Sequence, residues 1–308
     1  MPTDTPAAVE DSDPSTQALA AALPQIRAAR TKGWVSVVVA VLGSVALTIF
    51  LVSVVQADVV WIVFAMMAGV FGVLGAIGWT RGKHERVVMP IIAEAFGLSY
   101  DKAASNFYTG LPKNFIPLGG RRSVDDMMSG RVADRTFRFA ECKTETGGKN
   151  SSTLFKGVVL QLQSKGALPE FIVASEKETK GFLFFKGRVN VDGMVLLDQA
   201  TGSDGQTYGL WSLSDGPTRM AGLRAFMERI IAAGPRVLGS STLYSLVSNG
   251  QYYYVSLRHQ RDLFKIGGLL ADDASVMSDI RRAATELAHP VELATEILRA
   301  EEALLAAR

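Results

Sequence analysis

The sequence predicts an α+β membrane protein: an N-terminal two-helix transmembrane hairpin, then a cytosolic domain with a mostly antiparallel sheet and closing C-terminal helices. Three observations support this fold class. Two long apolar runs lie between Trp34 and Thr80, apolar residues alternate with period two through the middle of the chain, and helical spacing returns after Asp273. Strands followed by separate helices are typical of α+β proteins.

The apolar stretch from Trp34 to Thr80 is interrupted only by Gln56, Ala57 and Asp58. Each half is about 22 residues long and uncharged, and about 20 apolar residues cross the hydrocarbon core of a bilayer. We therefore expect an uncleaved anchor of two spans surrounded by lipid. The chain then divides into a disordered or juxtamembrane segment (1–33), the hairpin (34–80) and a cytosolic α+β domain (81–308).

Basic residues flank the two apolar runs on one side of the predicted membrane. Arg27, Arg30 and Lys32 precede the first run, and Arg81, Lys83 and Arg86 follow the second, whereas the loop between the runs has no Lys or Arg. Positively charged flanks stay on the cytoplasmic side of a membrane. We therefore expect both termini, and the whole C-terminal domain, in the cytoplasm.

Small residues recur at helical spacing in the second run, where Ala65, Gly69, Gly72 and Ala76 share one face. Small residues allow two helix backbones to approach closely in lipid. The simpler interpretation is that the two spans pack on each other; the alternative is that this face drives self-association. Neither run contains an ionisable residue, so the sequence gives no sign of an ion path.

Composition excludes several classes of function for this chain of 308 residues. Its formal net charge of +2 provides no strong basic surface for nucleic acid. The single cysteine, Cys142, excludes an intrachain disulfide and a CxxC site. The three histidines, His84, His259 and His289, lack the spacing of metal ligands, and we expect surface or capping roles for them. We therefore predict neither a metal nor a cofactor.

Helical and irregular segments are predicted around the anchor. Residues up to about Thr16 are expected to be disordered, and a helical stripe from Glu85 to Phe96 should end at Gly97. The further segments are a short helix over Gln17–Arg30, a short helix over Asp101–Ser105, a loop over Leu111–Gly120, a helix over Met220–Ala232, and two closing helices, Asp273–Ala288 and Val291–Ala307, the second opened by Pro290.

Strand spacing predicts a sheet in the middle of the chain. The candidate strands are Thr136–Lys143, Leu154–Gln163, Phe171–Ala174, Phe182–Phe185, Met194–Leu197 and Thr207–Leu213. Asn249-Gly250 lies between two runs of β-favouring residues and predicts a two-residue hairpin. In that register Leu246 faces Tyr253, and Tyr244 faces Val255 on the same side.

Motifs that carry chemistry are incomplete in this sequence. Gly147-Gly148-Lys149 lacks the Ser or Thr and the upstream glycine of a phosphate loop, and Gly239-Ser240-Ser241 lacks the second glycine of a nucleophile elbow. Among single residues, Asp126 and Glu141 could be acids with raised pKa, although pairing with Lys or Arg is the usual role of such a Glu. Lys156 completes this set of candidates.

Short motifs in a fixed order give the chain a family resemblance. They are Gly97-Leu98-Ser99-Tyr100, Asp125-Asp126 followed by Gly130, Phe139-Ala140-Glu141, Leu154-Phe155-Lys156-Gly157-Val158 and Asp262-Leu263-Phe264. In these the chain resembles a bacterial membrane-anchored family, the domain-of-unknown-function family three-one-three-seven. The resemblance implies the bacterial inner membrane and, through relatives, a LemA-type membrane protein as partner; it implies no catalytic or cofactor-binding residues.

The motif positions also have a physical interpretation of their own. Gly130 suits a turn, Gly157 suits a close approach of two backbones within a strand, and Phe155 should pack while Lys156 projects to the opposite face. We therefore expect a non-catalytic membrane-anchored module that binds a protein partner or scaffolds an assembly. The alternatives are a membrane-tethered enzyme, such as a hydrolase using Asp126, Glu141 or Lys156, and a cytosolic sensor of a lipid or small ligand.

Overall fold

The computed structural model describes residues 14–53, 59–113, 115–166, 169–179, 189–213, 222–233, 241–267 and 271–306. The chain divides into two compact units. One, the helical unit, contains Met1–Phe96 and Phe264–Thr285; the other, the sheet unit, contains Gly97–Leu263 and Glu286–Arg308. Each unit therefore combines segments that are far apart in the sequence.

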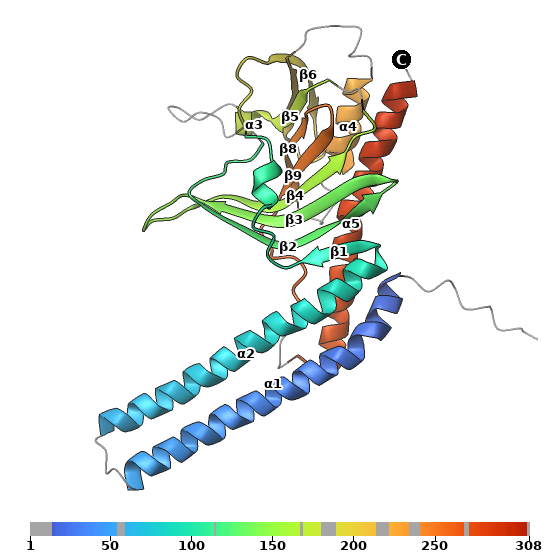
Figure 1. The fold of residues 1–308 in the computed structure, drawn as a ribbon. Helices are drawn as coiled ribbons and strands as arrows, with labels where there is room; N and C mark the ends of the chain where they lie inside the picture. The colour runs from blue at the N-terminus through green and yellow to red at the C-terminus, as the bar shows by residue number, and fades with distance from the viewer. Residues whose placement is uncertain are drawn as a thin grey trace, which may run out of the picture. The chain divides into compact units, whose positions relative to one another are not determined.

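The sheet unit is built on nine described strands in the order β1-β2-β3-β4-β9-β8-β5-β7-β6 (Figure 1). Every described pair of neighbouring strands is antiparallel, which confirms the predicted α+β class. The strands are β1 (Leu98–Asp101), β2 (Arg121–Val132), β3 (Arg135–Glu145), β4 (Thr153–Gln163), β5 (Phe171–Ser175), β6 (Val195–Thr201), β7 (Thr207–Ser212), β8 (Thr242–Ser248) and β9 (Tyr252–Arg258).

Helices cover one face of this sheet. In α4 (Leu223–Ala233) the Phe226 ring stacks on Tyr253 at 5.7 Å between ring centroids and meets Phe171 edge-on at 5.8 Å. The second half of α5 (Asp273–Ala306) adds Glu301, a fully buried carboxylate that accepts hydrogen bonds from the backbone N–H of Lys165 at 2.9 and 3.1 Å. Aromatic burial and these charge-assisted hydrogen bonds hold the helices on the sheet.

The opposite face is covered by the chain between β1 and β2, which contains the short 3₁₀ helix η1 (Phe107–Gly110). Two buried hydroxyls of the sheet hold this segment: Thr144 donates to the carbonyl of Pro117 at 2.6 Å, and Ser245 donates to that of Phe115 at 2.8 Å. The buried thiol of Cys142 packs in the same layer. Burial raises the pKa of Cys142 to about 12, so it serves as a small packing residue.

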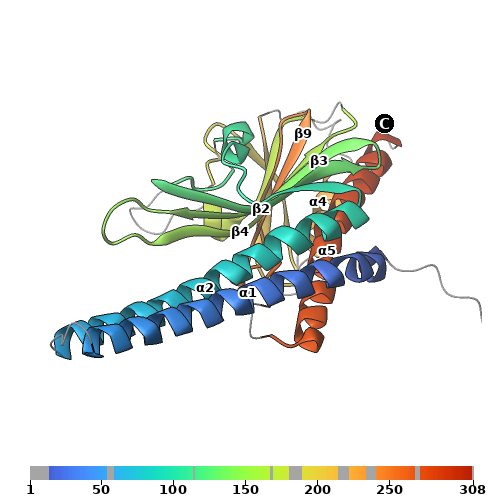
Figure 2. The ribbon, with the colours of Figure 1, turned by 60° about the horizontal axis from the view of Figure 1, so that its bottom comes forward.

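The helical unit contains α1 (Pro14–Ser53) and α2 (Val59–Ala95), which run side by side in Figures 1 and 2. Among the described residues, Leu23–Leu51 is long and apolar enough to cross a membrane, whereas the apolar stretch of α2, Val63–Gly75, is shorter. The structure therefore contains one clear candidate span. The helical stripe predicted from Glu85 forms the last part of α2, and the helix ends, as predicted, just before Gly97, which has a φ of +68°.

Several predicted elements differ at the ends of the chain. The expected disorder up to Thr16 is wrong for residues 14–16, because α1 begins at Pro14. The short helix expected over Gln17–Arg30 is not separate, because α1 continues through Pro24 into the candidate span. The two closing helices are one helix, α5, with Pro290 inside it. Proline removes one helical hydrogen bond but does not end a helix whose packing compensates for the loss.

Strand assignments were incomplete near β2. The helix expected over Asp101–Ser105 is wrong, since Asp101 ends β1, and β2 itself was not predicted. The predicted strand Met194–Leu197 corresponds to β6, and the helix over Met220–Ala232 corresponds to α4, which begins at Leu223. The predicted strand Phe182–Phe185, like the loop Gln56–Asp58 and Gly239-Ser240, lies outside the described residues.

The β8–β9 hairpin exists, but its predicted register is wrong. Leu246 pairs with Val255 rather than Tyr253, because the turn residues are Gly250 and Gln251 instead of Asn249 and Gly250. The side chain of Asn249 accepts hydrogen bonds from the backbone N–H groups of the two residues after Gly250. This Asx-type bonding moves the turn by one residue. An irregularity between Leu243 and Ser245 also places Tyr244 on the η1 side of the sheet, away from Leu246.

Candidate functional site

A cluster of polar side chains, of which Asp126, Glu141 and His259 are buried, forms where β2, β3 and β4 approach the chain that leaves β9. We call residues His259–Leu263, which follow β9 and end at the boundary of the sheet unit, the connector. We define the polar cluster as Tyr100, Lys102, Asp126, Glu141, Lys156, His259 and Asp262. It includes Asp126, Glu141 and Lys156, the three residues that the sequence offered as candidates for chemistry.

Asp126 occupies an irregular position in β2. The pairing with β3 shifts between Asp125 and Met128, and Asp126 has a φ of +51°, a left-handed conformation that Asp tolerates better than most residues. Its carboxylate accepts hydrogen bonds from the Tyr100 hydroxyl at 2.5 Å and the Lys102 ammonium at 3.0 Å. Burial raises the pKa of Asp126, while these two donors lower it.

Glu141 lies in the middle of β3 and is 8% exposed. One carboxylate oxygen accepts a hydrogen bond from the backbone N–H of Leu263 at 3.0 Å, which joins β3 to the last residue of the connector. Burial is the main cause that raises the pKa of Glu141 to about 7; the negative charges of Asp262 and Asp126 contribute to the rise, and the Leu263 hydrogen bond and Lys156 oppose it. Glu141 therefore titrates near neutral pH.

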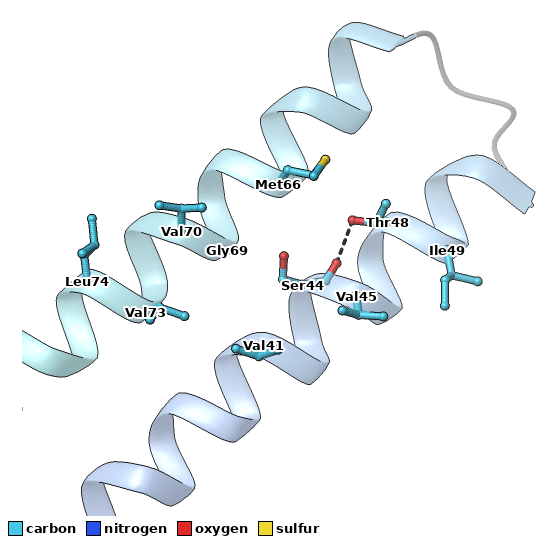
Figure 3. Close-up of a pocket in the computed structure, with 10 residues that line it drawn as sticks. All are labelled: Val41, Ser44, Val45, Thr48, Ile49, Met66, Gly69, Val70, Val73 and Leu74. Carbon is cyan, nitrogen blue, oxygen red and sulfur yellow. Dashed lines mark hydrogen bonds between the residues drawn. The ribbon is translucent and has the colours of Figure 1, made fainter. Parts of the chain in front are cut away.

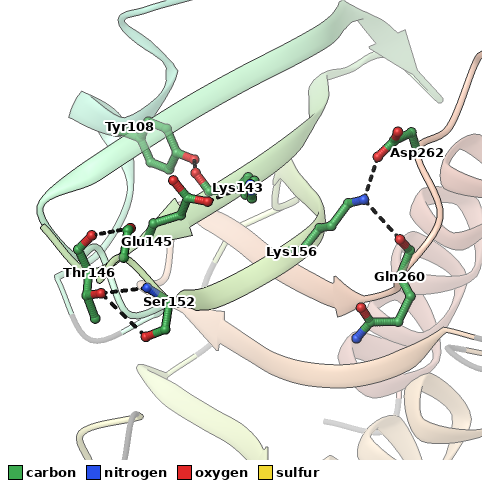
Figure 4. A network of polar contacts seen from close by, with 9 residues as sticks. Tyr108, Lys143, Glu145, Thr146, Ser152, Lys156, Gln260 and Asp262 are labelled. Carbon is green, nitrogen blue, oxygen red and sulfur yellow. Dashed lines mark hydrogen bonds and ion pairs between the residues drawn. The ribbon is translucent and has the colours of Figure 1, made fainter. Parts of the chain in front are cut away.

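Lys156 on β4 holds the other end of the connector (Figure 4). Its ammonium donates to the carbonyl of Gln260 at 2.9 Å and forms an ion pair with the Asp262 carboxylate. The backbone carbonyl of Lys156 also accepts the N–H of His259 at 3.1 Å. Two neighbouring strands thus bind both ends of the connector through one carboxylate and one ammonium.

His259 is a buried imidazole, 4% exposed, whose Nε2 atom has no hydrogen-bond partner within the described part of the chain. Burial, with smaller contributions from the positive charges of Lys156 and Arg261, lowers the pKa of His259 to about 4. The imidazole is therefore neutral at physiological pH. The expected surface or capping role of His259 is wrong, because the connector folds back onto β4.

The remaining motif residues have structural positions. A Cβ on Gly157 would lie 1.9 Å from the carbonyl oxygen of Leu257, so the predicted close approach is present. Gly130 lies within β2 rather than in a turn, and a Cβ there would lie 2.9 Å from the carbonyl oxygen of Gly97. Phe155 packs edge-on against Tyr244 at 5.4 Å between ring centroids, on the face opposite Lys156.

The small-residue face of α2 packs on α1 around an apolar groove of about 490 Å³ (Figure 3). The Ser44 hydroxyl donates to the carbonyl of Ala65 at 3.3 Å, and a Cβ on Gly69 would lie 2.2 Å from that hydroxyl. A Cβ on Gly72 would lie 3.8 Å from the Cβ of Ala40. The packing of α1 on α2 fits the simpler interpretation of this face; the side chain of Ala76 lies outside the described residues.

Tyr100, Lys102, His259 and Asp262 were not predicted as members of a site. Tyr100 lies on β1, Lys102 follows it, and His259 and Asp262 belong to the connector. The contacts that bring the connector to β3 and β4 join residues more than 100 positions apart in the sequence, in the pairs Lys156–Asp262 and Glu141–Leu263. Among the described residues, no group of three or more His, Cys, Asp or Glu side chains is arranged to hold a metal ion. The one sequence signal was the motif Asp262-Leu263-Phe264, which predicts no contact by itself.

Comparison with known proteins adds one structural similarity. No protein-family model matches the chain, and no curated protein matches it. The crystal structure of the mycobacterial trehalose monomycolate transport factor A matches with a TM-score of 0.34 and 10% sequence identity, over 65% of this chain and 93% of that one. A similarity at this level supports no statement about the function of this chain.

Proposed function

We propose that this chain is a multi-pass protein of the bacterial inner membrane whose sheet unit is a non-catalytic module that binds a protein partner on the cytosolic side. One observation carries the membrane placement: large apolar side chains are exposed along both α1 and α2. They include Trp34, Val35, Val39, Leu42, Ile49 and Phe50 on α1, and Trp61, Phe64, Met66, Val70, Phe71 and Leu74 on α2. Water does not favour so continuous an apolar surface, whereas lipid does.

Reporter fusions test this topology. A reporter that is active only in the cytoplasm should function when fused after Arg308, and a reporter that is active only outside should function when inserted between Gln56 and Asp58. Replacing Arg27, Arg30 and Lys32 by Glu should reduce this preference, because the basic flanks set the orientation. A C-terminal reporter that works only outside the cytoplasm would contradict the proposal.

The contacts of the polar cluster support a binding module over an enzyme. The carboxylates of Asp126 and Glu141 and the ammonium of Lys156 each hold another part of the same chain, as described above. A group that already binds its own backbone or a neighbouring side chain needs to break that contact before it can act on a substrate. These residues therefore first stabilise the fold, by holding other segments of the same chain in place.

One edge of the sheet offers a surface for a partner. β6 is the last of the described strands in the sheet order, and outside α1 and α2 the exposed large apolar side chains of the described residues are Val195, Leu196 and Leu213. An edge strand with exposed apolar side chains is a common docking site for an extended segment of another protein. Val195 and Leu196 lie on β6 itself.

Photo-crosslinking in intact membranes tests this partner surface. A photoreactive residue at position 195 should give a discrete crosslinked product, either with a second protein or with a second copy of this chain. The same residue at the exposed Gln251, in the turn before β9, is the control and should give none. Equal crosslinking at both positions, or only uncrosslinked monomer, would contradict a specific surface at β6. A LemA-type membrane protein is the first partner to look for, on the basis of the family resemblance.

A membrane-tethered hydrolase is a second candidate, favoured by one observation. Asp126, Glu141 and Lys156 do converge in one cluster, and a carboxyl whose pKa lies near 7 suits general acid–base catalysis. Turnover of a hydrolysable ester or phosphate by the purified chain, lost in Glu141→Gln, would favour this candidate over the binding module.

A further inference from the structure

The apolar groove between α1 and α2 is open along one side of the helix pair. Its walls are exposed apolar side chains from both helices: Val41, Val45, Ile49, Met66, Val70 and Leu74 (Figure 3). The two hydroxyls that line it are bound within the protein, because Ser44 donates to the carbonyl of Ala65 and Thr48 donates to that of Ser44 at 2.9 Å. The groove therefore suits an apolar occupant.

The α1 wall of the groove continues as one helix face into the basic segment that precedes the apolar run. Residues on this face recur at intervals of three, four or seven: Arg27, Arg30, Trp34, Val41 and Val45. Lys32 follows Arg30 by two residues, which places it about 200° around the helix, on the other side. Two arginines, an indole and the groove thus follow one another along a single side of α1.

The distances along this face match one leaflet of a bilayer. Trp34, whose indole favours the membrane interface, lies 11 residues before Val45 in the groove, or about 16 Å along the helix. Half of the hydrocarbon core is about 15 Å thick. Arg30 lies about 6 Å beyond Trp34, at the depth of the lipid headgroups. An acyl chain that ends in the groove would therefore place its phosphate beside the arginines.

Positive charge dominates at this depth. Residues 27–32 and 81–86 contain six Lys or Arg and one acid, Glu85. In the described part of the helical unit, Asp272 also lies close enough to Arg30 for their charges to interact. A guanidinium has five N–H donors, so a contact with one carboxylate leaves donors for a phosphate. This surface therefore favours an anionic headgroup over a zwitterionic one.

We propose that this side of the helical unit binds an anionic phospholipid of the cytosolic leaflet, with its phosphate at Arg27 and Arg30 and one acyl chain in the groove. The inference rests on the membrane placement proposed above, and it extends general contact with lipid to recognition of one lipid class. A third apolar helix would also fill the groove, but it would give the two arginines nothing to bind. Basic residues that only set the orientation need not share a face with the groove.

Photoactivatable lipids test this proposal on the full-length chain in phosphatidylcholine vesicles. Two probes carry the same diazirine near the end of one acyl chain and differ only in the headgroup, which is phosphatidylglycerol or phosphatidylcholine. At equal mole fractions, the phosphatidylglycerol probe should label residues 41–49 about fivefold more than the other probe, the factor that one basic residue near an anionic headgroup provides. Mass spectrometry of the labelled peptides measures this ratio.

Two matched variants locate the headgroup site. Arg30→Gln should lower the labelling ratio to about twofold or less, because it removes one of the two guanidinium groups in line with the groove. Lys32→Gln removes the same charge at nearly the same depth but on the other side of α1, and it should leave the ratio unchanged. An equal loss in both variants would overturn the proposal, since it would show a general effect of positive charge.

The unmodified chain separates this proposal from the membrane placement on which it rests. Equal labelling of residues 41–49 by the two probes would overturn the lipid site and leave the membrane placement intact. Labelling at the exposed Val39 but not at Val45 would show that another helix or a second copy fills the groove, and would also overturn the lipid site. No labelling of α1 by either probe would contradict both proposals.

Discussion

At the level of single residues, Glu141 makes the stability of the sheet unit depend on pH. Its pKa is about 7 in the folded chain and 4.5 for an unperturbed Glu, so between these values the folded state binds more protons than the unfolded state. The free energy of unfolding therefore falls as pH rises through this window, and the loss is complete above the folded pKa. The upper bound of this effect is about 3 kcal/mol.

We predict that Glu141→Gln raises the stability of the chain at pH 8 by up to about 3 kcal/mol, and changes it little at pH 4. Chemical unfolding of the full-length chain in micelles, followed by circular dichroism of the sheet, measures this difference. Glu145→Gln is the control: Glu145 lies on the same strand, but its side chain is partly exposed. A stability difference that is the same at both pH values would show that the carboxyl of Glu141 does not titrate in this window.

His259 should make the free energy of unfolding depend on pH in the opposite direction to Glu141. Its pKa is about 4 in the folded chain, below the value of 6.5 for an unperturbed histidine, so the unfolded state binds more protons as pH falls between these values. Stability is therefore lost on acidification through this range. We predict that His259→Gln is more stable than the unmodified chain at pH 4.5 and shows no such gain at pH 8. The same unfolding experiment measures it, and an equal effect at both pH values would contradict it.

At the level of elements, close backbone approach fixes the packing at two glycines. In the sheet, Gly157 lies against Leu257 in the ladder between β4 and β9, which joins strands β1–β4 to the other described strands. In the helical unit, Gly69 lies against Ser44. Gly75, on the same helix, is a control for Gly69, and Gly147, in the connection between β3 and β4, is a control for Gly157.

We predict that Gly157→Ala destabilises the chain by about 3 kcal/mol or more, because the added methyl group meets backbone atoms that cannot move independently. Gly147→Ala is the control, since a Cβ at Gly147 makes only an ordinary contact at 3.8 Å with Gly120. Chemical unfolding of both variants measures the difference. Similar stabilities for the two variants would contradict the close approach of β4 to β9.

We predict that Gly69→Val separates α1 from α2, whereas Gly75→Val does not, because a Cβ at Gly75 has nothing within 4 Å. Cysteines introduced at Ala40 and Gly72 report the separation, since a Cβ at 72 would lie 3.8 Å from that at 40, a distance that suits a disulfide. Oxidation should crosslink this pair efficiently in the Gly75→Val background and weakly in Gly69→Val. Equal crosslinking would show that this face does not hold the helices together.

The sequence predicts elements well where the period is regular. Phe137 and Phe139 alternate with polar or small residues, and β3 has the predicted position. β2 was missed because Asp125 and Asp126 interrupt its pattern and the irregularity at Asp126 shifts the period. The polar cluster was beyond prediction for the same reason: with β2 unrecognised, nothing in the sequence placed Asp126 beside Glu141, and the connector reaches β3 and β4 from more than 100 residues away.

At the level of the whole molecule, α5 contributes to both compact units, which divide it between Thr285 and Glu286. Its second half buries Leu293, Ala294, Ile297 and Leu298, and Glu301 binds the backbone at Lys165. We predict that a chain ending at Thr285 aggregates or is degraded, because the sheet loses this cover. A chain ending at Ala306 is the control and should remain stable; size-exclusion chromatography in detergent distinguishes the two outcomes.

The order of segments in the helical unit also affects how the protein is made. Its first two helices leave the ribosome early, but the unit is complete only when Phe264–Thr285 has been translated, after nearly the entire sheet unit. That segment carries side chains that the folded chain buries, such as Val276 and Ile280. A stalled or prematurely released nascent chain would lack them and leave this unit incomplete, which gives chaperones and proteases a way to recognise incomplete copies.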